Sequence, residues 1–154
     1  LVNSPFTIPF SKLPFKVLVK EVTKEISLPF FHVTPFLLRH SGSSYGYRFM
    51  FEDKIVAYCP DTGYCKNAIN LARNADLLIA ESALLIRPNS SKWGHLLPEE
   101  AALIAKKANV RKLALTHFDA AAYKSFDDRN MANRRAVAVF KNTVCVKDGL
   151  KILV

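Results

Sequence analysis

The sequence predicts an α/β domain built on a mixed β-sheet, and three observations in residues 54–82 indicate this fold class. An apolar run rich in β-branched residues, Ile55–Cys59, has the length of a buried strand. Apolar residues at helical spacing follow in Asn67–Arg73. A second buried run, Leu77–Ala80, completes the unit. Strand, helix and strand in this order are typical of α/β proteins.

Two predicted strands precede this unit and make the sheet mixed. Phe30–Leu38 and Tyr45–Phe51 are apolar and extended in pattern, and the acidic pair after Phe51 predicts a hairpin-like turn into the next strand. The antiparallel part of the sheet therefore comes first. Alternating residues in Phe15–Val22 predict one more strand. The segment Leu1–Phe15 is rich in Pro and Phe, so we expect it to be irregular or extended and to cover an apolar surface.

Helices and strands alternate in the remainder of the chain. Proline and two glutamates at its start predict a helix from Pro98 to about Asn109. Ser125 and Asp128, three residues apart, resemble a capping box and open a helix that runs to about Phe140. The further predicted strands are Lys112–Thr116, Thr143–Val146 and Leu150–Val154, the last two joined by the turn residues Asp148 and Gly149.

Length and charge limit the classes of protein to consider. A chain of 154 residues, half of them hydrophobic, is long enough for one domain with a buried core. The net charge of +9 favours polyanionic partners such as nucleic acid or nucleotides, although ordinary solubilising charge explains it equally well. No apolar run approaches the roughly 20 residues that span a membrane, so we expect no membrane partner. Three cysteines without metal-site spacing are expected to be free thiols in a reducing, cytoplasmic compartment.

Polar residues stand where the predicted strands end. They are His40, Asp61, Glu81 and His117, and His95 lies in the long loop Ser82–Leu97. Loops at the carboxyl ends of neighbouring strands share one edge of a sheet, so the four side chains that follow strands are expected to converge. Imidazoles and a carboxylate suit zinc. Taken singly, each histidine can be a hydrogen-bonded turn or surface residue, the Asp61 segment a simple turn, and Glu81 a helix cap.

Three collinear segments carry a resemblance to a known family. They are HSGSSYGYRF (40–49), YCPDTGYCKNAINLARNADLLIAES (58–82) and GHLLPEEAALIAKKANVRKLALTHF (94–118). Together they resemble the metallo-β-lactamase fold hydrolases, specifically the ribonuclease Z-like phosphodiesterase branch, from about residue 28 to the end of the chain. The resemblance implies an αββα sandwich, of which this chain is the carboxyl-terminal half with a mixed sheet and flanking helices.

The resemblance also assigns roles to the five polar residues. His40 and His117 match histidines that each ligate one of two metal ions, and Asp61 matches the aspartate that bridges both. The implied cofactor is zinc, two per complete site, with manganese or iron as alternatives. Glu81 and His95 match a carboxylate–histidine pair that protonates the leaving group. A carboxylate behind an imidazole orients it and favours its protonated form, as a general acid requires.

Two departures from the family pattern bear on activity. The signature His-x-His-x-Asp-His, which carries three histidines and the water-activating aspartate, is absent from these 154 residues. The segment from His117 to Tyr123 also lacks the arginine that ribonuclease Z tends to carry near a tyrosine. We therefore interpret residues 1–154 as a single partial domain, with the missing amino-terminal half or a homo-oligomer as the expected partner.

The expected function is that of a zinc phosphodiesterase of the ribonuclease Z type, which processes the 3′ ends of transfer RNA by endonucleolytic cleavage. One alternative is a phosphodiesterase of the same fold that acts on cyclic nucleotides or small phosphate esters. Another is a non-catalytic module that binds nucleic acid. By the family pattern each metal draws on two protein ligands from this chain, fewer than the three usual for catalytic zinc. This chain alone is therefore expected to bind zinc weakly and to be inactive.

Overall fold

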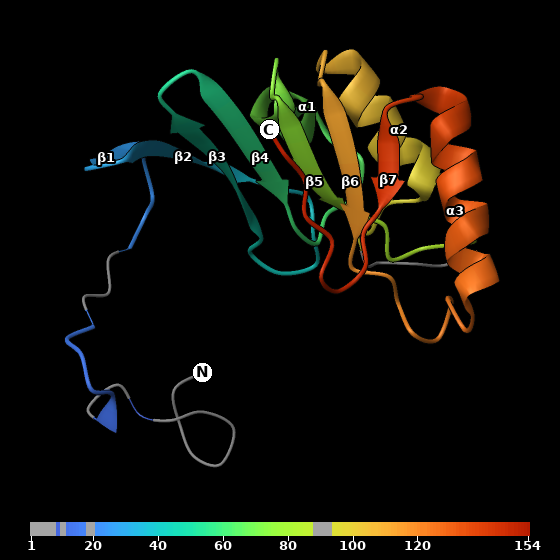
Figure 1. The fold of residues 1–154 in the computed structure, drawn as a ribbon, viewed down its shortest axis with the longest axis horizontal. Helices are drawn as coiled ribbons and strands as arrows, with labels where there is room; N and C mark the ends of the chain where they lie inside the picture. Colours follow the sequence, from blue (N-terminus) through green and yellow to red (C-terminus); the bar gives the residue numbers. More distant parts are fainter. Residues whose placement is uncertain (1–8, 10–11, 18–20, 88–93) are drawn as a thin grey trace.

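The structure is a computed structural model that describes residue 9 and residues 12–17, 21–87 and 94–154. In this part of the chain seven strands form one sheet, with three helices on one of its faces (Figure 1). The strands are β1 (Ile26–Leu28), β2 (Phe31–Leu37), β3 (Tyr45–Phe51), β4 (Lys54–Cys59), β5 (Leu77–Glu81), β6 (Lys112–Thr116) and β7 (Thr143–Cys145). The helices are α1 (Lys66–Ala72), α2 (Pro98–Lys107) and α3 (Phe126–Val139).

The sheet is mixed, and its antiparallel part comes first, as predicted. Strands β1 to β4 pair antiparallel, whereas β4 to β7 pair parallel. The two-residue connection between β3 and β4 contains Glu52 with a φ of 45°. Two reversals of direction separate β2 from β4, so β2 runs the same way as β4, β5 and β6. The carboxyl ends of these four strands consequently lie at one edge of the sheet.

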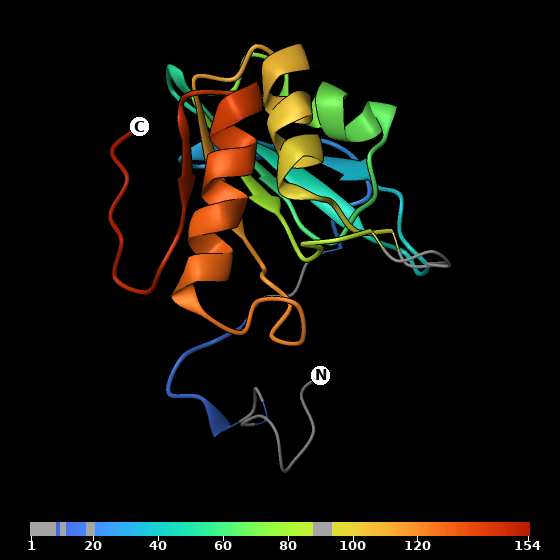
Figure 2. The ribbon, with the colours of Figure 1, turned by 90° about the vertical axis from the view of Figure 1, so that its right-hand side faces the viewer.

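The core lies between the sheet and the helices, all of which cover the same face (Figure 2). Leu71 of α1 and Ile104 of α2 are fully buried against it. From the central strands, every second residue enters this core: Ala57 and Cys59 of β4, Leu78 and Ala80 of β5, and Leu113 and Leu115 of β6. None of the helices in the described ranges is long and apolar enough to cross a membrane.

Local sequence signals set the ends of two helices as predicted. Pro98 is the first residue of α2, and the Glu100 carboxylate accepts a hydrogen bond from the backbone N–H of Leu97 at 3.0 Å. At the start of α3, the Ser125 hydroxyl accepts from the backbone N–H of Asp128, whose carboxylate accepts from the backbone N–H of Ser125 at 2.8 Å. This reciprocal pair is a capping box.

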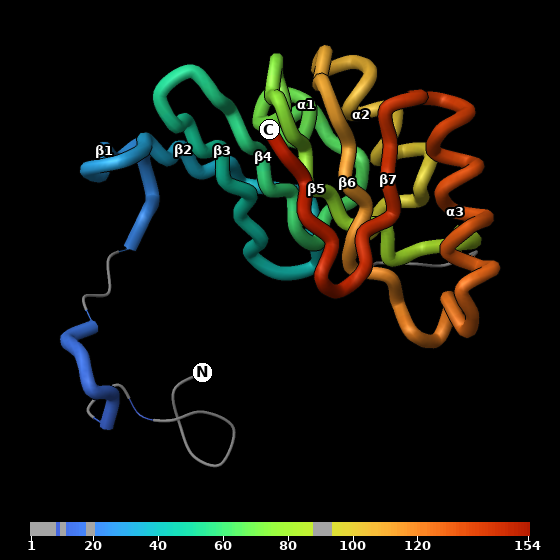
Figure 3. The backbone as a smooth tube through the Cα atoms, viewed as in Figure 1, coloured from blue at the N-terminus to red at the C-terminus, as the bar shows by residue number. Residues whose placement is uncertain are grey.

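The chain ends differ from the predictions. The predicted strand Leu150–Val154 is wrong: the chain turns at Lys147–Leu150, where Gly149 has a φ of +80°, and continues without strand pairing. It runs back over the sheet face opposite the helices (Figure 3), where it meets no free strand edge. The three-residue strand β1 was not predicted. The predicted strand Phe15–Val22 lies partly outside the described residues, and its described flanks are not in a strand.

The sheet face opposite the helices, called here the helix-free face, is aromatic at the antiparallel end. The Phe31 and Phe49 rings lie 5.8 Å apart, and Phe51 stacks on Phe49 at 6.2 Å. Tyr47 of β3 pairs with Tyr58 of β4 on the same face. An apolar hollow of about 500 Å³ is lined by Val22 and by residues of β1, β2 and β3. Apolar side chains thus occupy both faces of the sheet.

Candidate active site

All five predicted site residues gather at the edge where β2, β4, β5 and β6 end. His40 follows β2, Asp61 follows β4, Glu81 ends β5 and His117 follows β6. His95 reaches the same edge from the segment before α2. Four of them line a pocket of about 600 Å³, together with Ala83, Leu84, Phe118, Asp119 and Ala120; Glu81 lies buried behind it.

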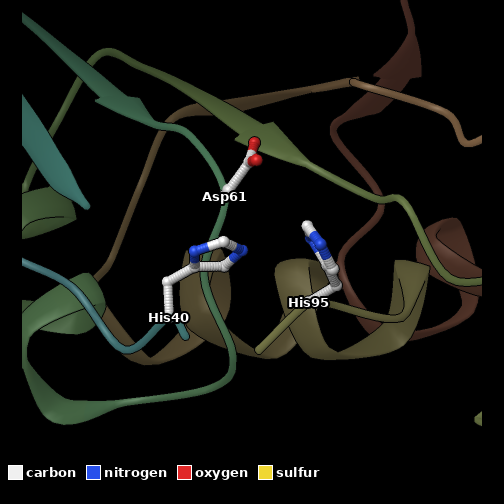
Figure 4. A group of neighbouring side chains, drawn as sticks. All are labelled: His40, Asp61 and His95. Atoms are coloured by element: carbon white, nitrogen blue, oxygen red, sulfur yellow. The ribbon is translucent and has the colours of Figure 1, made fainter. Parts of the chain in front are cut away.

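The donor atoms of three side chains lie close enough to share one ion. One ligand atom from each of His40, Asp61 and His95 falls within 4.8 Å of the other two (Figure 4). The ring centroids of His40 and His95 are 5.1 Å apart. His117 also lies close, with its Nε2 3.3 Å from Asp61 Oδ1 and its ring 5.9 Å from that of His95. The predicted convergence of His40, Asp61 and His117 at one edge is therefore what the geometry gives.

A buried carboxylate holds His95. Glu81 is fully buried, and its Oε1 lies 2.7 Å from Nδ1 of His95. A carboxylate oxygen accepts, so the Nδ1–H of His95 donates to it. The backbone N–H of Thr62 also donates to Oε1, and that of Ala83 donates to Oε2, each at 2.8 Å. One carboxylate therefore ties together the loops after β4 and β5 and the segment before α2.

Thr62 and two glycines fix the loop that carries His40. The Thr62 hydroxyl accepts from the backbone N–H of Arg39 at 3.2 Å and donates to the Gly63 carbonyl at 2.9 Å. The Gly63 N–H donates to the Arg39 carbonyl at 2.7 Å. Gly94 packs against this pair: a Cβ there would collide with the Arg39 carbonyl oxygen and lie 3.0 Å from the Gly63 nitrogen. These contacts join the segments that carry His40, Asp61 and His95.

The backbone at His117 is strained. Its φ of 53° is in the left-handed region, which costs a residue other than glycine of order 1–3 kcal/mol. The neighbouring Thr116 carbonyl accepts a hydrogen bond from the backbone N–H of Ser82 at 2.9 Å, which anchors the turn. This turn leads the chain out of β6 and places the His117 imidazole next to Asp61.

The segment after β5 lines the pocket and is held by two residues, Tyr123 in the loop before α3 and Arg135 in α3. The Tyr123 hydroxyl donates to the Leu84 carbonyl at 3.2 Å, and Arg135 donates to the Leu85 carbonyl at 2.5 Å and to the Glu99 carboxylate at 2.6 Å. Burial raises the pKa of Tyr123 to about 12, so it stays a donor. The pocket wall is thereby braced against α2 and α3.

The donor set fits a divalent metal. Nε2 of His40 is buried and meets no hydrogen-bond partner in the described part of the chain, an arrangement that is costly unless a ligand occupies it. The Gly42 N–H approaches Nδ1 of His40 at 3.5 Å, too long to fix the tautomer. Imidazole nitrogen and carboxylate oxygen are the donors that zinc takes in catalytic sites.

Comparison with known proteins agrees with this geometry. The family described as the beta-lactamase superfamily domain matches residues 5–118. The chain belongs to this family. Its fold is the metallo-β-lactamase fold: the YhfI protein of Bacillus subtilis, a metallo-β-lactamase fold protein, superposes with a TM-score of 0.74 at 27% identity over 92% of this chain and 58% of YhfI. The predicted fold class is confirmed.

The relatives of this chain include ribonuclease Z from several organisms. That of Protochlamydia amoebophila is 40% identical over 90 residues, or 57% of this chain and 28% of the relative. That of Thermobifida fusca is 34% identical over 104 residues, 66% of this chain and 32% of the relative. The predicted resemblance to ribonuclease Z is confirmed over this part of the chain. The chain spans about a third or less of the length of these relatives.

Proposed function

We propose that this chain is the carboxyl-terminal half of a metal-dependent phosphodiesterase of the ribonuclease Z type, acting on the 3′ ends of transfer-RNA precursors. The observation that carries the proposal is the gathering of His40, Asp61, His95 and His117 around one pocket in a chain of this family. Curated ribonuclease Z relatives at 34–40% identity support the branch. The net charge of +9 suits an RNA substrate.

In the proposed enzyme His40, Asp61 and His117 hold two divalent metal ions, with Asp61 between the two histidines. Zinc is the proposed metal because the donors are imidazole and carboxylate, and manganese or iron are alternatives. Metal ions bound there would supply Lewis acidity at the phosphorus and a nucleophile at neutral pH. The 3.3 Å contact between Asp61 and His117 supports this placement of the Asp61 carboxylate beside His117.

His95 and Glu81 are the proposed catalytic acid pair. Glu81 accepts the Nδ1–H of His95, so Nε2 is the nitrogen that can pass a proton to the leaving oxygen. The two backbone N–H groups on Glu81 keep the carboxylate in place during this transfer. Glu81 is fully buried and does not line the pocket, so we give it a positioning role behind His95.

The remaining metal ligands and the water-activating group are proposed to come from a second half outside these 154 residues. The helix-free face supports this, because Phe51 and Tyr58 leave 38% and 40% of their surface exposed there beside the apolar hollow. Exposed apolar patches of this kind mark interaction surfaces. The partner is proposed to be the amino-terminal half, or a second copy in a homo-oligomer.

A second candidate is phosphodiester hydrolysis of cyclic nucleotides or small phosphate esters at the same site. The observation that favours it is the segment from His117 to Tyr123, which lacks the arginine expected for a transfer-RNA substrate. A third is a module that binds nucleic acid without catalysis, which the basic charge alone would support.

We also propose a cytoplasmic location. The three cysteines, Cys59, Cys65 and Cys145, are all described and all free. Free thiols are the rule in reducing compartments, and burial raises the pKa of Cys59 well above its usual range, which keeps it protonated and unreactive.

A substrate panel on the complete enzyme tests the proposal. Metal content and hydrolysis of a transfer-RNA precursor, of cyclic nucleotides and of bis(p-nitrophenyl) phosphate would be measured together. Cleavage of the precursor at its 3′ end supports the first candidate, and preference for the cyclic nucleotides supports the second. A metal-free complete protein that cleaves none of them would contradict both and leave the binding module.

Two substitutions in the complete enzyme test the roles. Asp61→Ala should remove metal and activity together, because one carboxylate serves both ions. His95→Ala should leave the metal bound and lower turnover by roughly 10²–10⁴-fold, the usual contribution of a general acid. His32→Ala is the matched control, since His32 is exposed on β2 and its imidazole meets Ser27. Reversed effects of the first two variants would contradict the assignment.

A further inference from the structure

The positive charge of the chain does not lie in the pocket. Among the described residues, histidines, two aspartates and apolar side chains line the pocket, and none of its lining residues is a lysine or an arginine. The chain nevertheless carries a net charge of +9. A protein that binds nucleic acid neutralises several phosphates with lysine and arginine. In the described part of the chain, a surface that does so lies outside the pocket.

Basic side chains gather at the opposite edge of the sheet, where β4, β5, β6 and β7 begin (Figure 1). Each helix returns the chain from the pocket edge to this edge, so the segments at the ends of α1, α2 and α3 meet there. These segments are residues 73–76, 106–112 and 141–142, and they hold six basic residues and one acidic residue. The six basic residues, called here the basic edge, are Arg73, Lys106, Lys107, Arg111, Lys112 and Lys141.

Hydrogen bonds join the three segments into one surface. The Asn74 N–H donates to the Ala108 carbonyl at 2.7 Å, and the side-chain amide of Asn109 donates to the side-chain oxygen of Asn74 at 3.0 Å. The side-chain amide of Asn142 donates to the Arg111 carbonyl. Asparagine side chains thus tie together the backbone that carries the basic residues, and the spacing of these residues is set by the fold.

Most of the basic edge is open to a binding partner. All of its residues except Lys112 are exposed. Arg111 pairs with Asp76 at 3.2 Å, yet 77% of its side chain stays accessible. Within the described ranges, Arg73, Lys106 and Lys141 make no ion pair.

The surrounding groups do not cancel this charge. The turn at residues 52–54 lies at the same edge and adds two acidic residues and one lysine, which gives seven basic and three acidic groups in all. Arg48 donates to the carbonyls of Leu71 and Arg73 and so covers the end of α1. The ends of α2 and α3 contribute about half a negative charge each, so an excess of about three positive charges remains.

The basic edge suits phosphate groups better than bases. Its three segments contain no aromatic residue on which an unpaired base would stack. A nucleic acid duplex carries one charge per about 1.7 Å of its axis, which is a dense partner for a row of lysine and arginine side chains.

We infer that the basic edge is a binding surface for the phosphate backbone of double-stranded nucleic acid, separate from the pocket. Strands of five or six residues span about 17–20 Å, so the bound duplex lies about that far from the reacting phosphate. The inference rests on the proposed function only for the identity of the nucleic acid, which is then the helical part of the transfer-RNA precursor.

The test measures binding of a short fluorescent RNA duplex to the complete protein by anisotropy, between 50 and 200 mM salt. The triple variant Arg73→Gln, Lys106→Gln, Lys141→Gln removes three cations. Each phosphate contact contributes about 0.9 to the slope of log K against log salt, so this variant should flatten the slope by about 2.7. The control triple, Lys24→Gln, Lys66→Gln, Lys124→Gln, removes exposed lysines outside the basic edge and should leave the slope almost unchanged.

Several results would overturn the inference. They are a folded wild-type protein that binds no duplex, equal slopes in the wild type and the first triple, and a loss of slope confined to the control triple. Phosphatidylserine vesicles are the comparison: vesicle binding that the first triple abolishes while it spares duplex binding would make the edge a membrane surface instead.

Two further measurements keep the test decisive. Circular dichroism checks folding, and if the first triple fails to fold, the double variant Lys106→Gln, Lys107→Gln at the exposed end of α2 should flatten the slope by about 1.8. Hydrolysis of bis(p-nitrophenyl) phosphate, which needs only the pocket, should be equal in the wild type and both triples. Binding is read without hydrolysis, so a complete protein that cleaves no precursor would count against the proposed function and not against this surface.

Discussion

Thr62→Val tests whether the loops at the site are held by the Thr62 hydroxyl. Valine has almost the shape of threonine and removes only the hydroxyl group. In the structure that hydroxyl is fully buried, accepts from the Arg39 N–H at 3.2 Å and donates to the Gly63 carbonyl at 2.9 Å. Both partners are backbone groups of the loops that carry His40 and Asp61. Valine would leave both without this partner.

The magnitude follows from these two groups. A buried polar group left unsatisfied costs about 1–3 kcal/mol, and the Arg39 N–H is only partly buried, so we expect a total loss of about 2 kcal/mol. For a domain of this size that lowers Tm by about 4–8 °C. Because His40 follows Arg39 directly, the affinity of the chain for zinc should fall as well, by about 10–100-fold.

Chemical denaturation and zinc titration of the same samples measure both effects. Thr62→Ser, which keeps the hydroxyl, should retain most of the stability and the affinity. Thr23→Val is the control for the exchange itself, since Thr23 is exposed and should change stability by less than about 0.5 kcal/mol. If Thr62→Val matched the wild type in both measurements, the hydroxyl would not be what holds these loops.

Three further predictions concern packing and pH. Gly94→Ala should cost about 1–3 kcal/mol by overpacking against the Arg39 carbonyl, whereas Gly42→Ala, with nothing within 4 Å, should not; equal denaturation midpoints would contradict this. Burial raises the pKa of Cys145 from 9.0 to about 11, so its contribution to stability is complete below pH 9 and is lost as pH rises through 11. Cys145→Ala should remove that part of the decline in a denaturation series from pH 8 to 11, and an unchanged decline would argue against it. Ile104→Ala should cost about 2–5 kcal/mol in the core, and Leu153→Ala, 95% exposed, almost nothing; a similar loss in both would refute the assignment of the core.

The parts of the fold that the sequence predicts are those with a local signal. The strand β6 has the predicted bounds, because an apolar run between polar residues marks a strand buried on both faces. α3 begins where its capping box indicates. The three-residue strand β1 was missed because it is too short to show a pattern before Pro29. The strand expected at Leu150–Val154 had suitable residues, but strand pairing depends on an available edge, which is a property of the whole sheet.

In the candidate site, too, only the residues with a local sequence signal could be predicted from the pattern. His40, Asp61 and His117 could be placed together because they follow strands, and parallel strands bring their carboxyl ends to one edge. The place of Thr62 could not be predicted, because its hydrogen bonds join loops 23 residues apart. His95 lies in a loop with no strand signal, so its place at the site was predicted only through the family resemblance that pairs it with Glu81. The hydrogen bond between Thr62 and the buried Glu81 is a tertiary contact, and no periodicity in the sequence indicates it.

The strand order of the sheet bears on how the protein is made. Strands β1 to β7 lie in the sheet in the order in which they leave the ribosome, so each new strand finds its neighbour already synthesised. Short separations between paired segments favour rapid folding, and domains fold from the amino terminus during synthesis. The loops after β2 and β4, the buried Glu81 and His95 are all in the chain before β6, α3 and β7 are synthesised. The hydrogen bonds of Glu81 to Thr62, Ala83 and His95 can therefore join the loops after β4 and β5 to the segment before α2 on the nascent chain, before His117 is synthesised.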